Sequence, residues 1–166
     1  MGVGPSFCAW IRLLYTEPTA RVKLGSLVSD TIHIERGTRQ GCPLSPMLFA
    51  LALEPMAIWV RQVMERWAIE VGGNRHLVSL YADDTLFYLS NPAESVFVLL
   101  EGLEAFGRVS GLHLNQAKSL VFPLGALRDV PPERLPTLPL RWECSRFRYL
   151  GIIIAHYPRD RMAHNM

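Results

Sequence analysis

Cysteine is scarce in this chain of 166 residues, which contains only Cys8, Cys42 and Cys144. These three residues are far apart and odd in number, so they exclude a disulfide framework and lack the paired spacing of a zinc site. The five histidines show no metal-ligand spacing either. The cysteines therefore indicate reduced thiols, as in an intracellular protein.

Long hydrophobic runs are also missing. The first residues lack a basic region leading into an apolar core, which excludes a signal peptide as the interpretation of this start. The longest apolar run, Met47–Val60, is broken by Glu54 and Pro55 and is too short to span a bilayer. These features predict a soluble chain that does not contact a membrane.

Lysine is rare, because 15 of the 17 basic residues are arginine. The net charge of +2 is too small to indicate nucleic-acid binding by itself. Arginine suits bidentate contacts with phosphate, but it also accumulates for compositional reasons. A hydrophobic fraction of 49% with 19% charged residues predicts a folded core, either one domain or a piece of a larger one.

Local patterns predict an α+β chain. Apolar spacing predicts helices over residues 5–15, 46–67 and 92–109. We expect Ser45 to be the N-cap of the second helix and Gly111 to end the third. Residues 123–139 hold five of the twelve prolines and predict an irregular connector. The predicted strands cover residues 19–24, 31–35, 112–114 and 120–122, and residues 147–154 are expected to form a strand or a hairpin.

The most informative stretch is Leu77–Leu89, in which two β-favouring apolar runs flank Asp83 and Asp84. This pattern predicts a tight hairpin with both acids at its exposed tip. Adjacent carboxylates repel each other unless a proton or a cation lies between them, so the tip is a candidate site for a divalent metal. Taken alone, a solvated turn is the simpler interpretation. The residues expected to anchor the hairpin in the core are Leu80, Ala82, Leu86 and Tyr88.

The segment Tyr81–Asp84 resembles the metal-binding tip of reverse transcriptases. Three further segments resemble elements of the polymerases of non-LTR retrotransposons, the long interspersed elements, and all four occur in the family's order. The resemblance implies a partial polymerase palm over residues 1–154, with an antiparallel sheet whose metal-binding hairpin packs on two or three helices, and a polar tail over 155–166. The three further segments are Arg36–Pro46, Phe106–Gly111 with Asn115 and Lys118-Ser119, and Arg148–Ile152.

The resemblance also implies roles for single residues. Asp83 and Asp84 would be catalytic ligands of Mg²⁺ in a two-metal site, with Asp83 the principal ligand. Lys118 falls where a polymerase places a general acid for the departing pyrophosphate, although a surface lysine is a nearly equal alternative. The nucleotide- and template-binding candidates are Arg36, Arg39, Gln40 and Gly41, and the primer-binding candidates are Tyr149 and Gly151. Solvated charges, a turn glycine and a buried aromatic residue are the structural alternatives for these positions.

The family's palm needs a third carboxylate from a strand that precedes the first helix. Asp30 is the only aspartate before the hairpin, and its polar, turn-like setting does not fit that strand. We therefore expect a polymerase fragment that holds its second metal ion poorly and is inactive in isolation. Its expected partners are an RNA template, a DNA primer, deoxynucleoside triphosphates and the rest of the polymerase, in the nucleus if the family resemblance extends to location.

Two other functions stay open. The chain could be a non-catalytic nucleic-acid-binding module or a relic of a retroelement. A metal-dependent hydrolase using Asp83 and Asp84 is a third hypothesis, but no histidine or further acidic cluster completes such a site.

Overall fold

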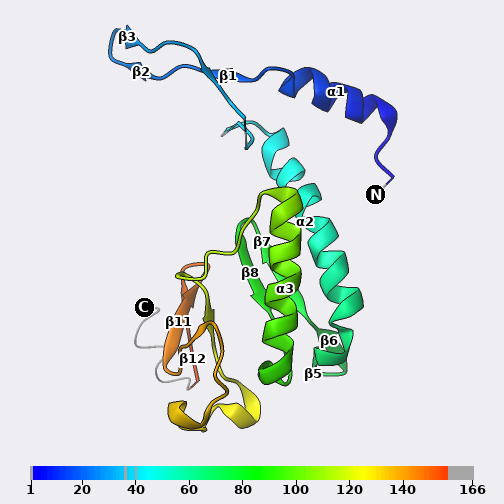
Figure 1. The fold of residues 1–166 in the computed structure, drawn as a ribbon, viewed down its shortest axis with the longest axis vertical. Helices are drawn as coiled ribbons and strands as arrows, with labels where there is room; N and C mark the ends of the chain where they lie inside the picture. Colours follow the sequence, from blue (N-terminus) through cyan, green and yellow to red (C-terminus); the bar gives the residue numbers. More distant parts are fainter. Residues whose placement is uncertain (1, 36, 40, 157–166) are drawn as a thin grey trace. The chain divides into compact units, whose positions relative to one another are not determined.

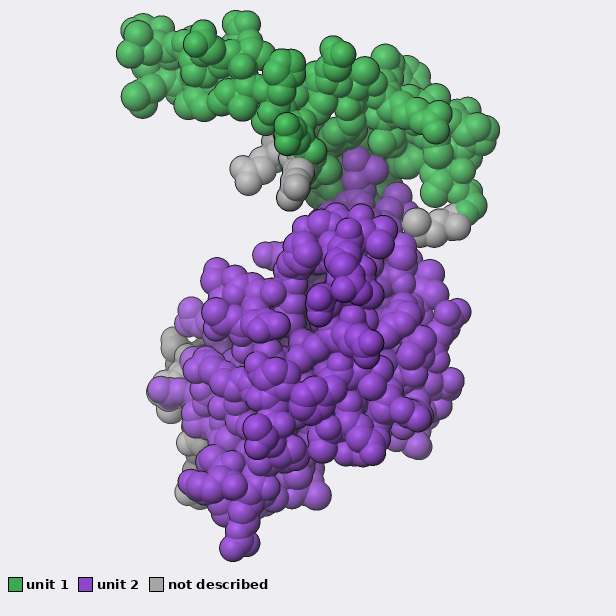
Figure 2. Space-filling model, viewed as in Figure 1, with its two compact units in different colours: residues 1–47 green, residues 48–166 purple. Residues whose placement is uncertain are grey.

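The computed structural model describes residues 2–35, 37–39 and 41–156. Its contacts divide the chain into two compact units, residues 1–47 and 48–166 (Figure 2). The assignment of residues 1–154 to a single palm domain stays a prediction.

The first unit consists of a helix followed by a narrow β-ribbon. Helix α1 covers Pro5–Tyr15, as predicted, and begins with a proline, which is favourable where no backbone donor is needed. Two antiparallel pairs form the ribbon in place of the longer strands that the sequence predicted. They are β1 (Thr19–Ala20) with β4 (Ile32–His33), and β2 (Lys23–Leu24) with β3 (Leu27–Val28). None of the described residues of α1 or of these strands is buried.

Helix α2 covers Leu44–Val63 and is followed by a short 3₁₀ helix, η1, over Glu65–Trp67. The prediction that Ser45 caps this helix is wrong, because α2 begins one residue earlier. The Ser45 hydroxyl instead donates a hydrogen bond to the carbonyl oxygen of Arg39 at 2.7 Å. This bond ties the preceding loop to the first turn of the helix.

By length and composition alone, α2 is able to cross a membrane. The expectation that no segment is long enough therefore does not hold for this helix. One such helix is weak evidence, since core helices of soluble proteins have the same properties. Four residues of α2 are buried in the structure, namely Leu53, Met56, Ala57 and Val60.

The core of the second unit lies between α2, α3 and one β-hairpin (Figure 1). Helix α3 covers Pro92–Ser110 and ends at Gly111, whose φ of +74° is the left-handed conformation that glycine adopts easily, as predicted. The hairpin consists of β7 (Val78–Tyr81) and β8 (Asp84–Phe87). The buried residues of this core are Leu53, Met56, Val60, Met64, Trp67, Leu77 and Leu99.

The described strands form six two-stranded sheets, so the predicted α+β mixture is present but the strands do not join into one sheet. The predicted strand over 112–114 is absent. The connector over 123–139 is irregular apart from two short 3₁₀ helices, η2 (Gly125–Leu127) and η3 (Pro132–Arg134). The remaining pairs of the second unit are β5 (Ile69–Val71) with β6 (Asn74–His76), β9 (Leu120–Val121) with β10 (Arg141–Trp142), and β11 (Arg146–Tyr149) with β12 (Ile152–Ala155).

Candidate active site

The β7–β8 hairpin carries the two adjacent acids at its tip. Tyr81 pairs with Asp84, which leaves Ala82 and Asp83 as a two-residue turn. Both acids are exposed to solvent. Ala82 has a φ of +49°, a conformation that costs an L-residue free energy and that hairpin turns usually assign to glycine. The tip therefore combines an exposed pair of carboxylates with a strained backbone.

The strand register separates the two faces of this hairpin. Val78, Leu80 and Phe87 pack against the core formed by α2 and α3. Because Ser79 pairs with Leu86, and side chains alternate along a strand, Leu86 lies on the opposite face from Leu80. The predicted anchoring of Ala82, Leu86 and Tyr88 in this core is therefore wrong. The outer face carries Ser79, Tyr81, Asp84, Leu86 and Tyr88, and the Ser79 hydroxyl donates to the Tyr88 hydroxyl at 3.3 Å.

Tyr149, in the β11–β12 hairpin, interacts with residues of this outer face of the β7–β8 hairpin. Burial raises the pKa of the Tyr149 phenol, and the nearby Tyr88 and Asp84 raise it further through their charges. Tyr149 is the last residue of β11, and the turn that follows contains Leu150 and Gly151, both with positive φ. Tyr149, a predicted primer-binding residue, thus interacts electrostatically with Asp84, a predicted metal ligand.

The acidic tip carries groups whose chemistry suits a divalent metal ion. Carboxylate oxygens are the ligands that Mg²⁺ prefers, and Mg²⁺ often binds through one or two carboxylates together with water and substrate phosphates. Asp83 and Asp84 fit this partial role. Across residues 2–35, 37–39 and 41–156, no group of three or more His, Cys, Asp or Glu side chains is arranged to hold a metal ion.

Lys118 lies in a turn beyond the C-terminal end of α3. Its backbone N–H donates to the side-chain oxygen of Asn115 at 3.2 Å and to the Asn115 carbonyl oxygen at 3.1 Å. In the described part of the chain, no ion pair joins Lys118 to Asp83 or Asp84. Its role in the site stays a prediction.

The predicted nucleotide-binding loop belongs to the first unit, whereas the acids belong to the second. Arg36 and Gln40 lie outside the described residues, and Arg39 is exposed. Gly41 has a φ of +78°, which explains why a glycine occupies this turn. The contribution of this loop to the site stays a prediction.

Cys42, in the same loop, is a chemically distinct residue that the sequence reasoning did not single out. A hydrogen bond from the backbone of Leu44 lowers the pKa of the Cys42 thiol, whereas partial desolvation raises it. Hydrogen bonds from Ser45 and the charge of Arg39 also lower this pKa. The position of the cysteine just before a helix is a signal from which this could have been inferred.

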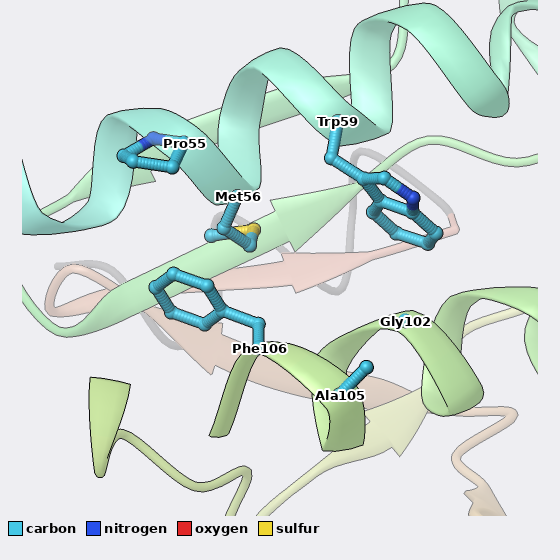
Figure 3. A pocket seen from close by; sticks show the side chains of 6 residues that line it. All are labelled: Pro55, Met56, Trp59, Gly102, Ala105 and Phe106. Carbon is cyan, nitrogen blue, oxygen red and sulfur yellow. The ribbon is translucent and has the colours of Figure 1, made fainter. Parts of the chain in front are cut away.

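A cavity of about 230 Å³ opens between α2 and α3 within the second unit (Figure 3). An ideal Cβ on Gly102 would lie 1.9 Å from Cη2 of Trp59, so the indole ring occupies the space that only a glycine leaves free. The lining offers no acid, base or nucleophile. This cavity belongs to the helix packing and not to the candidate active site. Its lining residues are Pro55, Met56, Trp59, Gly102, Ala105 and Phe106.

Comparison with known proteins identifies a relative of this chain. A protein from Xenopus laevis described as "Transposon TX1 uncharacterized 149 kDa protein" is 28% identical to this chain over 158 residues. The alignment covers 93% of this chain and 12% of that protein, so the chain spans about an eighth of the length of this relative. The name of this relative is that of a transposon protein, which agrees with the predicted resemblance to retrotransposon polymerases.

The family model described as "Reverse transcriptase (RNA-dependent DNA polymerase)" matches residues 1–154. This match includes the acidic hairpin, the turn with Lys118 and the β11–β12 hairpin. Enzymes of this family use divalent metals. The chain belongs to the reverse transcriptase family.

Proposed function

We propose that this chain is a palm segment of an RNA-templated DNA polymerase and that the tip of the β7–β8 hairpin binds catalytic Mg²⁺. The supporting observation is that one part of the hairpin packs in the core while another part is exposed. One face is anchored in the core through Leu80 and Phe87, while Asp83 and Asp84 remain exposed at the tip. A rigid support with free carboxylates is what nucleotidyl transfer requires.

When bound, Mg²⁺ supplies the positive charge that activates a primer hydroxyl and stabilises a leaving pyrophosphate. Asp83 is the principal ligand in this proposal, and Asp84, closer to the strand, is the weaker one. Their charges repel each other, so binding of a cation relieves an unfavourable contact. The strained turn at Ala82 fixes where these two side chains project.

The other residues bind substrate in this proposal. Arg39 and Gly41, together with Arg36 and Gln40, contact the incoming deoxynucleotide and the template base. Tyr149 and Gly151 contact the end of the DNA primer, and Lys118 donates a proton to the departing pyrophosphate. Tyr149 is favoured for its role because it lies near Asp84, where the primer end would have to be.

The isolated chain of 166 residues is expected to be inactive or nearly so. Its described part offers two adjacent acids and no third side chain that completes a metal site. A second metal ion would therefore be held weakly. The missing ligand and the remaining substrate contacts would come from other parts of a larger polymerase, which would act in the nucleus.

A primer-extension assay on an RNA template tests this function. The chain alone should extend the primer little or not at all, whereas a longer polymerase containing it should do so with Mg²⁺ and lose activity on Asp83→Asn. Robust extension by the isolated chain would overturn the expected inactivity. Full activity of the longer polymerase after Asp83→Asn would overturn the assignment of the metal site.

A non-catalytic nucleic-acid-binding module is the second candidate. It is favoured by Arg148, which is exposed on β11 one position from Tyr149, and by the incomplete metal site. In this case a primer–template duplex would bind with a strong salt dependence and without any effect of Asp83→Asn. Loss of duplex binding in Asp83→Asn with Mg²⁺ present would instead support the polymerase site.

A further inference from the structure

The end of helix α3 is fixed by a series of local hydrogen bonds. The Ser110 hydroxyl donates to the carbonyl oxygen of Phe106 at 2.8 Å and accepts from the backbone N–H of Leu112 at 3.1 Å. The backbone N–H of Gly111 donates to the carbonyl oxygen of Gly107 at 2.8 Å. Together these bonds direct the chain away from the helix along a defined path.

His113 then folds back onto the helix. An ideal Cβ on Gly107 would lie 2.7 Å from Nδ1 of His113 and 3.1 Å from the carbonyl oxygen of Leu112. Gly107 is buried, so the absence of a side chain at this position allows the segment after α3 to lie against the helix. The contact between Gly107 and His113 therefore fixes the start of the next turn.

Asn115 organises that turn. Its side-chain oxygen and its carbonyl oxygen both accept from the backbone N–H of Lys118. The same carbonyl oxygen accepts from the Ser119 N–H at 3.0 Å and from the Ser119 hydroxyl at 2.8 Å. An asparagine that bonds the backbone three residues on holds a turn without any regular secondary structure.

We infer that Asn115 is a positioning residue for Lys118: it holds the turn that aims the Lys118 amine at the departing pyrophosphate, and the contact between Gly107 and His113 anchors that turn to α3. The inference rests on the proposed role of Lys118. Lysine has a long, flexible side chain, so a fixed backbone at its base reduces the number of positions that the amine samples. Asn115 itself touches neither substrate nor metal in this account.

The test uses the fact that the chain has only two lysines, Lys23 and Lys118. Pyridoxal 5′-phosphate followed by borohydride labels lysine amines, and mass spectrometry measures the label on each. In a longer polymerase containing this chain, inorganic pyrophosphate with Mg²⁺ should protect Lys118 from labelling, while Lys23 of the same chain serves as an internal reference. The variants are Asn115→Ala, Asn115→Asp, which retains the acceptor oxygen, and Gln116→Glu, which adds a charge nearby without that acceptor.

In Asn115→Ala, half-protection of Lys118 should need at least about fivefold more pyrophosphate, because the hydrogen bond from the Lys118 N–H to the Asn115 side-chain oxygen is lost. Asn115→Asp should need less pyrophosphate for half-protection of Lys118 than Asn115→Ala does. Gln116→Glu should change the amount of pyrophosphate needed only slightly. The amide of Lys118 should also exchange hydrogen faster in Asn115→Ala, while circular dichroism confirms that the chain is folded.

Four outcomes would count against the inference in different ways. Protection unchanged by Asn115→Ala would overturn the positioning role while leaving the role of Lys118 intact. Equal effects of Asn115→Ala and Asn115→Asp would show that the acceptor oxygen is irrelevant. If pyrophosphate fails to protect Lys118 in the unaltered longer polymerase, the proposed role of Lys118 is wrong. Unchanged exchange of the Lys118 amide in Asn115→Ala would reject the turn-holding role of Asn115.

Discussion

Tyr149 at the end of β11 and Asp84 at the start of β8 interact electrostatically. Burial raises the pKa of the Tyr149 phenol most, and the charges of Tyr88 and Asp84 raise it further. This relationship links two hairpins that are more than sixty residues apart in the sequence. It brings a primer-binding candidate and a metal-binding candidate into one region of the second unit.

The first prediction concerns this pair. Asp84→Asn removes a negative charge that disfavours the phenolate, so the pKa of Tyr149 should fall part of the way toward the ordinary value of 10.0. Burial remains, so the fall should be incomplete. Asp83→Asn is the matched control, since Asp83 is not among the groups that raise this pKa. A titration of ¹³C-labelled tyrosine followed by NMR measures both variants, and an equal fall in the two would contradict the geometry.

The same shift predicts a loss of stability at alkaline pH. The folded chain binds the phenolic proton more tightly than the unfolded chain, so this contribution is present below the ordinary pKa and is lost as pH rises through the raised value. Tyr149→Phe should reduce the alkaline fall in the free energy of unfolding, measured with urea between pH 8 and pH 11. Tyr81→Phe, on the exposed tip, should leave the fall unchanged.

Ala82→Gly should stabilise the acidic hairpin. The φ of +49° costs an L-residue about 1–2 kcal/mol, and glycine loses about 0.5–1 kcal/mol more backbone entropy on folding, so the net gain should be a few tenths to about 1 kcal/mol. Thr85→Gly, in the strand itself, should destabilise the hairpin. Urea unfolding measures both variants, and a loss of stability in Ala82→Gly would show that the turn does not carry this strain.

Much of the fold follows from local sequence patterns. Helix α1 matches its prediction, and α3 ends at Gly111 as expected, because proline and glycine act on the backbone directly. The two faces of the hairpin were misjudged for a simple geometric reason. A two-residue turn pairs Tyr81 with Asp84, so odd-numbered residues of β7 share a face with even-numbered residues of β8. If all even-numbered residues of both strands are assigned to one face, Leu86 and Tyr88 are placed on the wrong face.

Other features depend on contacts that no local pattern contains. The parallel pairing of β9 with β10 joins Leu120 to Arg141 across the proline-rich connector. The Trp59 ring of α2 packs against Gly102 of α3, and these two residues are more than forty positions apart in the sequence. The exposed position of Asp83 and Asp84 at a hairpin turn, in contrast, was predicted correctly, because aspartate between two β-favouring runs is typical of a turn. Their role as metal ligands stays a prediction.

Gly102→Ala should destabilise the second unit. The new methyl group would overlap the Trp59 ring, and relieving this overlap should cost about 1–3 kcal/mol. In Trp59→Leu the same glycine substitution should cost much less, since the ring is gone. Thermal or urea unfolding of the single and double variants measures this coupling. Equal costs in both backgrounds would show that the indole does not occupy this position.

His156→Phe should stabilise the region around β12. The ring of His156 stacks on Phe122 with centroids 4.3 Å apart, and both ring nitrogens are buried without a hydrogen-bond partner among the residues that the structure describes. Phenylalanine keeps the stacking and removes the unpaired polar atoms, for a gain of about 1–2 kcal/mol. His33→Phe, on the exposed ribbon, is the control. A loss of stability in His156→Phe would mean that the imidazole has a partner.

Binding of Mn²⁺ to the isolated chain, measured by electron paramagnetic resonance in competition with Mg²⁺, tests the metal site most directly because it does not require polymerase activity. Asp83→Asn should weaken binding at least about tenfold, and Asp84→Asn by less, because each removes a carboxylate ligand. Asp30→Asn, in the exposed turn of the first unit, should leave binding unchanged. Equal affinity of the unaltered chain and Asp83→Asn would contradict the assignment of the hairpin tip as a metal site.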